Sequence, residues 1–153
     1  MALATLLLAY AGGKMGLLSG KRPLASLAIA DGQLKPVRTK RQNAVSSLAD
    51  TDYHRIAPLN AGADPRASFE ALRKVVASYP GAAIIEQRDD YIYAEFTTQV
   101  LRFVDDVEFR LNEAAKTIDV RSASRLGRQD FGTNRKRIEK IRALLAGESG
   151  KRP

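Results

Sequence analysis

Acidic, hydroxyl and guanidinium side chains gather in two segments, FVDDVEF (103–109) and RSASRLGRQDFGTNRKR (121–137). Carboxylates can act as general acids or bases, whereas arginines beside serine hydroxyls bind phosphates and carboxylates through charge-assisted hydrogen bonds. The excess of arginine in the second segment favours an anion as the ligand. The possible anion pocket is predicted to comprise Asp105, Arg121, Ser122, Ser124, Arg125, Arg128, Asp130, Asn134 and Arg135.

Catalytic and metal-binding interpretations of these residues meet chemical obstacles. Neighbouring residues of a strand point to opposite faces, so Asp105 and Asp106 cannot easily share one ligand. Asp106 and Glu108 share a face, but two carboxylates without further ligands do not predict a metal site. A serine–histidine–aspartate triad would depend on His54, the single histidine, and the chain has no cysteine and no nucleophile-elbow pattern. We therefore assign no catalytic residue, no metal and no cofactor.

Hydrophobic periodicity predicts the elements that must position these side chains. A helix is expected to begin after the N-cap residue Asp64, with Pro65 in its first turn, and to stop at Pro80-Gly81. A period near 3.6 residues predicts a second helix that stops at Gly147. The predicted strands span 82–87, 91–99, 102–111 and 117–124, a further strand is expected around 54–58, and the final helix spans 133–146.

This order of elements predicts an α+β fold. An antiparallel β-meander of four strands, or slightly more, is expected to pack against one helix on its N-terminal side and one C-terminal helix. Matching the apolar faces of the last two strands pairs Leu111 with Ile118 and places Glu108 opposite Arg121.

Asp105 is the unusual residue of this sheet, because it occupies a position on the apolar face. A buried carboxylate needs a positive partner or several hydrogen bonds. The candidates just downstream are Arg125, Arg128 and Arg135, and the helix start near residue 133 would add free backbone N–H groups. Two interpretations stay open: a pocket for an anion, or a structural network of ion pairs that fixes the loop and the start of the helix.

The remaining chain divides by composition into segments around this domain. Residues 1–19 are predicted to be a signal sequence or membrane anchor, although they lack an early Lys or Arg, and a plain buried helix is the alternative. Residues 20–60 are expected to form a basic extended arm, residues 61–147 the α+β domain and residues 148–153 a flexible tail.

Charge is distributed unevenly along this basic chain, whose formal net charge is +8. Residues 1–50 carry seven Lys and Arg against two acids, residues 51–120 carry eight against twelve, and residues 121–153 carry ten against three. The basic ends suit an acidic partner such as anionic lipid, or they pair with the acidic middle inside one fold. The residues do not favour a nucleic-acid partner, because no recognised RNA- or DNA-binding motif appears and aromatic residues are not interleaved with the basic ones.

Long stretches of the chain resemble the family known as domain of unknown function 1499. The resemblance is carried by DGQLKPVRTKRQNAVSS, YIYAEFTTQVLRFVDDVEFRL and VRSASRLGRQDFGTNRKRIEKIRALL, and it covers about residues 14–146. It implies an envelope-associated protein, often with a signal sequence or anchor, and it implies no particular reaction.

These observations together predict a periplasmic or membrane-anchored domain that binds or scaffolds without catalysis and accepts an anionic ligand. The expected partners are anionic lipid headgroups, a small anionic ligand or an envelope protein. One alternative is a hydrolase-type enzyme that uses the Asp/Arg/Ser pocket, and a second is a cytoplasmic nucleic-acid-binding protein.

Overall fold

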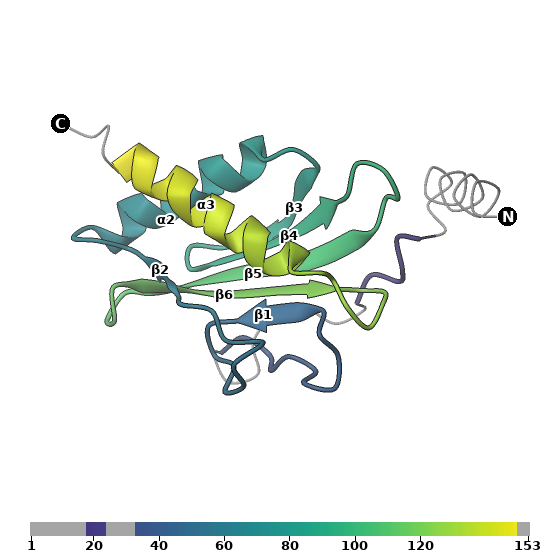
Figure 1. Ribbon diagram of the computed structural model, residues 1–153. Coiled ribbons are helices and arrows are strands. Elements are labelled where there is room, and N and C mark those ends of the chain that lie inside the picture. Colours follow the sequence, from purple (N-terminus) through teal and green to yellow (C-terminus); the bar gives the residue numbers. More distant parts are fainter. Residues whose placement is uncertain (1–17, 24–32, 150–153) are drawn as a thin grey trace, which may run out of the picture.

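A six-stranded antiparallel sheet with two helices on one face forms the fold (Figure 1). The computed structural model describes residues 18–23 and 33–149. The strand order is β1-β6-β5-β4-β3, and β2 pairs with the same edge of β6 as β1. The elements are β1 (Ala44–Ser46), β2 (Leu59–Asn60), α2 (Pro65–Ser78), β3 (Ala82–Gln87), β4 (Tyr91–Thr97), β5 (Val104–Asn112), β6 (Thr117–Ser124) and α3 (Thr133–Ser149). The predicted α+β class is confirmed.

The meander β3–β6 follows the predicted strands and their register. Leu111 pairs with Ile118, and Glu108 lies opposite Arg121, as the matched apolar faces require. The expected strand at 54–58 is wrong. In its place an isolated β-bridge joins Ser46 to Arg55, and the residues between β1 and β2 form turns. Among the described strands, only β1, before these turns, and β2, after them, pair with this edge of β6.

Both helices start where the sequence indicates. The Asp64 carboxylate accepts a hydrogen bond from the backbone N–H of Ala67 at 2.9 Å, and Pro65 needs no such partner in the first turn. The end predicted for α3 is wrong, because the helix continues through Gly147 to Ser149. Gly147 does not adopt the left-handed conformation that ends many helices at glycine, so the helix passes through it.

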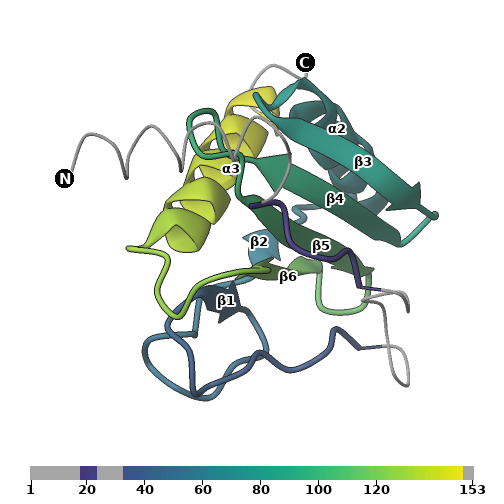
Figure 2. The same ribbon diagram turned by 90° about the vertical axis from the view of Figure 1, so that its right-hand side faces the viewer.

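The two faces of the sheet have different chemistry. The helix face carries the main core, in which Ile92, Phe96 and Phe109 pack against α2 and α3. The far face carries polar residues, which include the buried carboxylates of Asp106 and Glu108. Residues 18–23, shown in purple in Figure 2, pass across the sheet near β5.

The segment expected to be an extended arm takes part in this architecture. Ala44, Val45 and Ser46 are buried in β1, and Leu34 packs against the tyrosines of β4 on the far face. The predicted signal sequence or anchor at 1–19 lies almost wholly outside the described residues, and the envelope location that it implies stays a prediction. No described helix has the length and apolar character needed to span a membrane.

Candidate functional site

The predicted constellation is divided between the two faces of the sheet. Strand alternation in β5 directs Asp105 toward the helices and Asp106 toward the opposite face. Ser122 and Asn134 join Asp105 on the helix face, whereas Arg125 joins Asp106. The single pocket that the sequence suggests is therefore two separate polar clusters.

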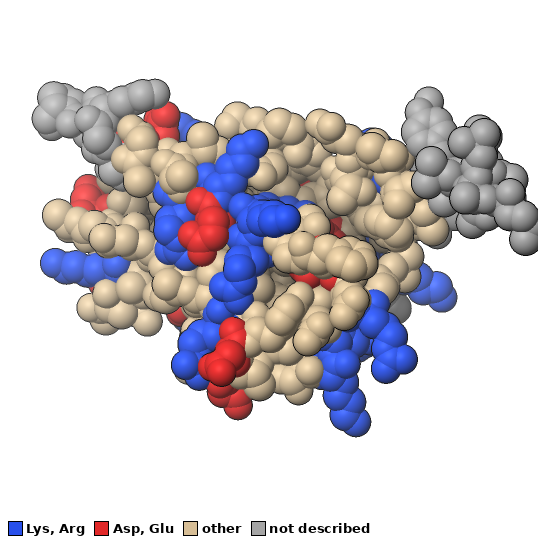
Figure 3. All heavy atoms as spheres, viewed as in Figure 1, with Lys and Arg blue, Asp and Glu red and all other residues tan. Residues whose placement is uncertain are grey.

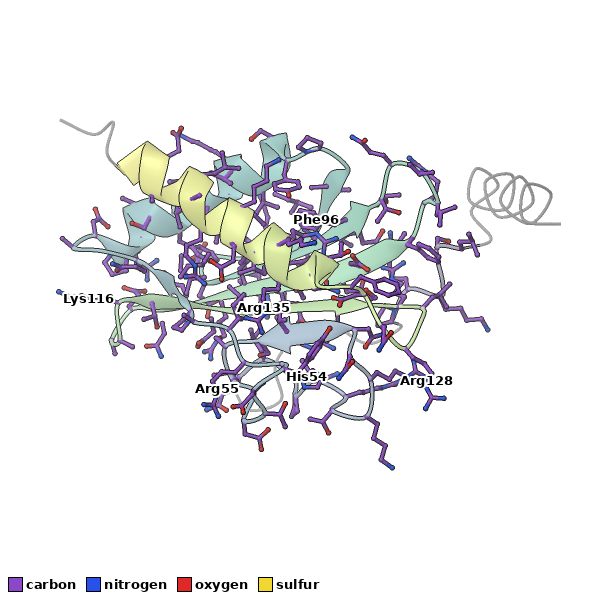
Figure 4. All side chains as sticks on the ribbon, in the orientation of Figure 1. His54, Arg55, Phe96, Lys116, Arg128 and Arg135 are labelled. Atoms are coloured by element: carbon purple, nitrogen blue, oxygen red, sulfur yellow. The ribbon has the colours of Figure 1, made fainter. Side chains whose placement is uncertain are left out.

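Asp105 is buried as predicted, but its partner is an arginine that the prediction omitted. Arg137 donates to the Asp105 carboxylate at 2.5 Å, and both side chains are at least 93% buried. The same guanidinium donates to Ser122 Oγ at 3.1 Å and to Asn134 Oδ1 at 2.8 Å, and it lies 5.0 Å from the ring centroid of Phe96. Phe96 lies beside the N-terminal half of α3 in Figure 4. This cluster has no free charge left for a ligand.

The start of α3 is occupied by a carboxylate of the protein itself. Asp130 accepts from the backbone N–H of Gly132 at 3.0 Å, and from the backbone N–H and side-chain amide of Asn134 at 3.1 and 2.7 Å. Burial opposes ionisation of Asp130, but these hydrogen bonds outweigh it and lower its pKa. Asp130 therefore stands where the predicted anion would bind, which supports a structural role for the loop.

The other predicted arginines of the loop and helix have different environments. Arg135 donates to the backbone carbonyls of Tyr53 and Arg55, each at 2.8 Å, so it fastens the 53–55 turn to α3. Arg128 is exposed, and no side-chain ion pair or hydrogen bond holds it among the described residues. Figure 4 shows it projecting away from the fold at the lower right. Neither arginine neutralises Asp105, which corrects the expected pairing.

Arg125 forms the centre of the cluster on the far face. Its Nε lies 3.0 Å from both carboxylate oxygens of Asp106, and its Nη2 contacts Glu95 and, at 3.1 Å, the hydroxyl of Tyr93. Arg22, from the segment that crosses the sheet, donates to Glu95 at 2.5 and 3.0 Å. The hydrogen bonds from Arg22, with those from Arg125, lower the pKa of Glu95 to about 2 against the opposing effect of burial.

Glu108 forms a second buried pair one position along the same face. Its side chain is completely buried, accepts from Arg121 at 3.0 Å and accepts from the Tyr91 hydroxyl at 2.9 Å. Burial is the main cause that raises the pKa of Glu108, and Arg121 opposes it. Burial also raises the pKa of Tyr91, so this hydroxyl stays a donor. The Nε–H of Arg121 is buried and has no hydrogen-bond partner among the described residues.

A basic cleft opens beside these pairs. It has a volume of about 860 Å³ and lies between the far face of β6 and the segments 21–23 and 35–44. Of the described residues that line it, half are basic and only Asp106 is acidic. The basic residues are Lys21, Arg22, Lys35, Arg38, Arg41, Arg121 and Arg125. Of the predicted site residues, Arg121, Ser124 and Arg125 line this cleft, and the other six do not.

Three cations of the cleft have no carboxylate partner among the described residues. Arg22, Arg121 and Arg125 pair with acids, whereas the described part of the chain provides no ion pair to Lys21, Arg38 or Arg41. We call these last three the unpaired cations.

The backbone at Arg41 is held in place by the single histidine. Buried His54 donates from Nε2 to the Arg41 carbonyl at 2.8 Å, and its Nδ1 lies 2.6 Å from the Thr51 hydroxyl. His54 is therefore a packing residue that fixes the 38–43 segment, and the triad considered for it is not assembled. Sequence reasoning does not find the unpaired cations, because they belong to the segment that is predicted to be a basic extended arm.

Two observations remove the support for the alternative functions. The Asp105 carboxylate is 4% exposed and bound by Arg137, so a hydrolase has no open carboxylate there. On α3, Arg137 is buried, Arg135 binds carbonyls and Lys140 lies 5.4 Å from the Tyr79 ring centroid, whereas Lys136 is exposed, so three of the four basic residues in 135–140 are engaged by the protein itself. Among the residues described, no cluster of three or more acidic or histidine side chains could hold a metal ion.

Comparison with known proteins agrees with the resemblance seen in the sequence. Residues 35–145 match the family described as "Protein of unknown function (DUF1499)", and this range is well over half of the chain. Comparisons with curated proteins and with solved structures give no match. The matched range contains the whole sheet, α2, most of α3 and most of the basic cleft, and the chain belongs to this family.

Proposed function

We propose that the domain is a non-catalytic module that binds a small, multiply charged anion in the basic cleft. The observation that carries this proposal is the presence of three unpaired cations in one cleft, next to arginines that are already neutralised by acids. Like charges confined to one cleft repel each other, and an anion between them removes that repulsion.

The size and chemistry of the cleft fit a polar molecule of limited size. A volume of about 860 Å³ lies within the range of small-molecule sites, which is about 300–1,000 Å³. Its lining offers guanidinium and ammonium donors from seven basic residues. Guanidinium groups match the geometry of phosphate and carboxylate oxygens, so phosphorylated or polycarboxylate compounds are the expected class.

Thermal unfolding of the full chain in the presence of pyrophosphate, inorganic phosphate and citrate tests this proposal. A compound that binds only the folded state raises the melting temperature as its concentration exceeds the dissociation constant. We expect a saturable rise with at least pyrophosphate, and a weaker rise at high ionic strength because salt screens the cations.

Variants of the unpaired cations localise the binding. Arg38→Gln and Arg41→Gln are each expected to weaken pyrophosphate binding about five- to tenfold, because each removes about 1 kcal/mol of attraction near the surface. Neither cation has an ion-pair partner in the described residues, so the unliganded variants should unfold near the parent's temperature. Lys74→Gln, on the exposed side of α2, is the matched control for lost charge. Equal binding by all three variants would contradict the proposal.

A further inference from the structure

Three loops project from one end of the sheet, and register places them together. Thr97 pairs with Val104, Asp105 with Ser124, and Ala44 with Ala123, so the segments that follow or precede these residues emerge at the same end. We define the loop end as residues 38–43, 98–103 and 125–132. Figure 1 shows these segments at the right-hand side of the fold, and the described residues 18–23 lie at the same side.

The loop end exposes the most accessible apolar side chains of the described chain. Phe131 is 85% exposed and Val100 is 64% exposed, the two highest values among the large hydrophobic residues that the structure describes. Leu126 is 39% exposed on the same loop as Phe131. Phe131 also adopts a left-handed backbone conformation with φ of 52°, which is uncommon for a residue other than glycine. The loop therefore presents an aromatic ring to solvent at a position where a smaller residue fits better.

Cations surround these apolar tips with almost no acid between them. Arg38, Lys40, Arg102 and Arg128 are all exposed, and none has an ion pair within the described part of the chain. The only acid of the loop end is Asp130, which is engaged in capping α3. Figure 3 shows basic side chains projecting from the lower right of the molecule, where Figure 1 places the loops around β1 and after β6.

We propose that the loop end docks onto an anionic lipid bilayer, with Phe131 and Val100 entering the headgroup boundary and the surrounding cations contacting headgroup phosphates. Interfacial binding needs exposed apolar groups next to Lys and Arg, and anionic lipids attract such cations. The apolar residues are on the tips of separate loops, which suits insertion into a soft surface better than a groove for a folded partner. The loop end adjoins the basic cleft, because Arg38, Arg41, Asn43 and Arg125 line both. Phe131, Val100, Arg102, Arg128 and Lys40 do not line the cleft, so variants at these positions test lipid docking separately from the proposed anion site.

The absence of tryptophan from the chain makes a site-specific test possible. Phe131→Trp introduces a single fluorescent reporter in the full-length protein, and Leu144→Trp is the matched control, since Leu144 is 44% exposed on the part of α3 distant from the loops. Vesicles of phosphatidylcholine, with and without phosphatidylglycerol, are added to each protein. We expect Phe131→Trp emission to shift to shorter wavelength and to be quenched by brominated acyl chains only when phosphatidylglycerol is present, and Leu144→Trp emission to stay unchanged.

Affinity variants separate docking by the loop end from binding by the apolar run near the N-terminus. Phe131→Asn is expected to weaken vesicle binding about tenfold, and asparagine tolerates the left-handed conformation, so the fold is preserved. Arg128→Gln is expected to weaken binding about fivefold, whereas Lys116→Gln is its control at the opposite end of the sheet (Figure 4).

Three results would overturn the proposal. The first is failure of the full-length protein to bind phosphatidylglycerol vesicles at all. The second is binding with no change in Phe131→Trp emission, which would assign the contact to another part of the chain. The third is an emission shift that depends on protein concentration without lipid, which would identify the loop end as a contact between copies of this chain.

Discussion

Replacement of Arg137 by methionine tests whether the helix-face cluster is a structural network. Methionine fills much of the same volume, so the variant removes the guanidinium while it keeps most of the packing against Phe96. It leaves the Asp105 carboxylate, which is 4% exposed, without its positive partner. The hydroxyl of Ser122 and the side-chain oxygen of Asn134 also lose a donor, although they remain hydrogen-bonded to each other.

The expected loss follows from these contacts. Removal of one member of a buried ion pair costs about 3–5 kcal/mol, because the other charge stays buried and uncompensated. A domain of this size has a total stability of about 5–15 kcal/mol, so the variant should lose a large fraction of it. The matching change in melting temperature is roughly 10–20 °C.

Equilibrium urea unfolding, followed by circular dichroism, measures the loss. Asp105→Asn should also destabilise the protein, because it leaves Arg137 buried without an anion. The double variant Asp105→Asn/Arg137→Met should be more stable than Arg137→Met alone, since no uncompensated charge remains. Arg128→Met is the control, and its exposed side chain predicts a change within about 0.5 kcal/mol. A loss below about 1 kcal/mol for Arg137→Met, or a double variant no more stable than the single one, would refute the structural interpretation.

Two further predictions concern the far face and a tight turn. The pKa of Glu95 falls from 4.5 to about 2 in the folded protein, so the folded state binds the proton of this carboxyl group less tightly than the unfolded chain does. The ionised carboxylate therefore stabilises the fold above pH 4.5, and this stabilisation disappears as the pH falls toward 2. Urea unfolding at pH 7 should therefore show Glu95→Gln to be less stable than the parent by at most about 3 kcal/mol, and solvent screening at the exposed Arg22 makes the loss smaller. The difference should shrink as the pH approaches 2. A difference that stays constant with pH would contradict the assignment. Gly81→Ala should cost more than about 2 kcal/mol in the same assay, because a Cβ would lie 2.4 Å from the Thr97 carbonyl oxygen at a φ of +80°, and near-parent stability would show that the turn can move.

The sheet from β3 to β6 could be predicted because its strands are long and their faces alternate. Phe109, Val107 and Leu111 alternate with charged residues, so a one-residue slip would turn the apolar side chains to the other face, and the register that matches the apolar faces is observed. The strands β1 and β2 have three and two residues, which is too short for alternation to distinguish them from a loop. Their position depends on pairing with β6, a contact between residues about 60 to 80 positions apart.

The partner of Asp105 could have been found from the helix pattern. Asn134, Ile138, Ile141 and Leu145 form the buried stripe of α3, and Arg137 lies three residues after Asn134 on the same stripe. An arginine on a buried stripe predicts a buried acid opposite it. Arg125, Arg128 and Arg135 are nearer to Asp105 in the sequence, but nearness in sequence does not fix the direction of a side chain, and the loop residues have no periodicity that would.

The basic cleft could not be predicted in this way, since its cations come from separate segments. The hydrogen bond from His54 to the carbonyl of Arg41 positions Arg41. Lys21 is positioned by its neighbour Arg22, which pairs with Glu95 on β4. Each of these contacts joins a loop to a distant part of the chain, so the position of the loop depends on the tertiary fold. The sequence shows the basic composition of residues 20–60, and only the fold shows that these charges converge.

The two polar clusters differ in a way that separates a structural role from a binding role. On the helix face, Asp105 and Arg137 neutralise each other and their remaining hydrogen-bonding groups are shared with Ser122 and Asn134. An added ligand would have to break those contacts, so this cluster gains nothing from binding. In the cleft, the paired arginines lie beside the three unpaired cations, whose mutual repulsion an anion would relieve. The single pocket that the sequence suggests contains residues of both clusters. Asp105 and Asp106 point in opposite directions from one strand, and this separates the structural cluster from the cleft.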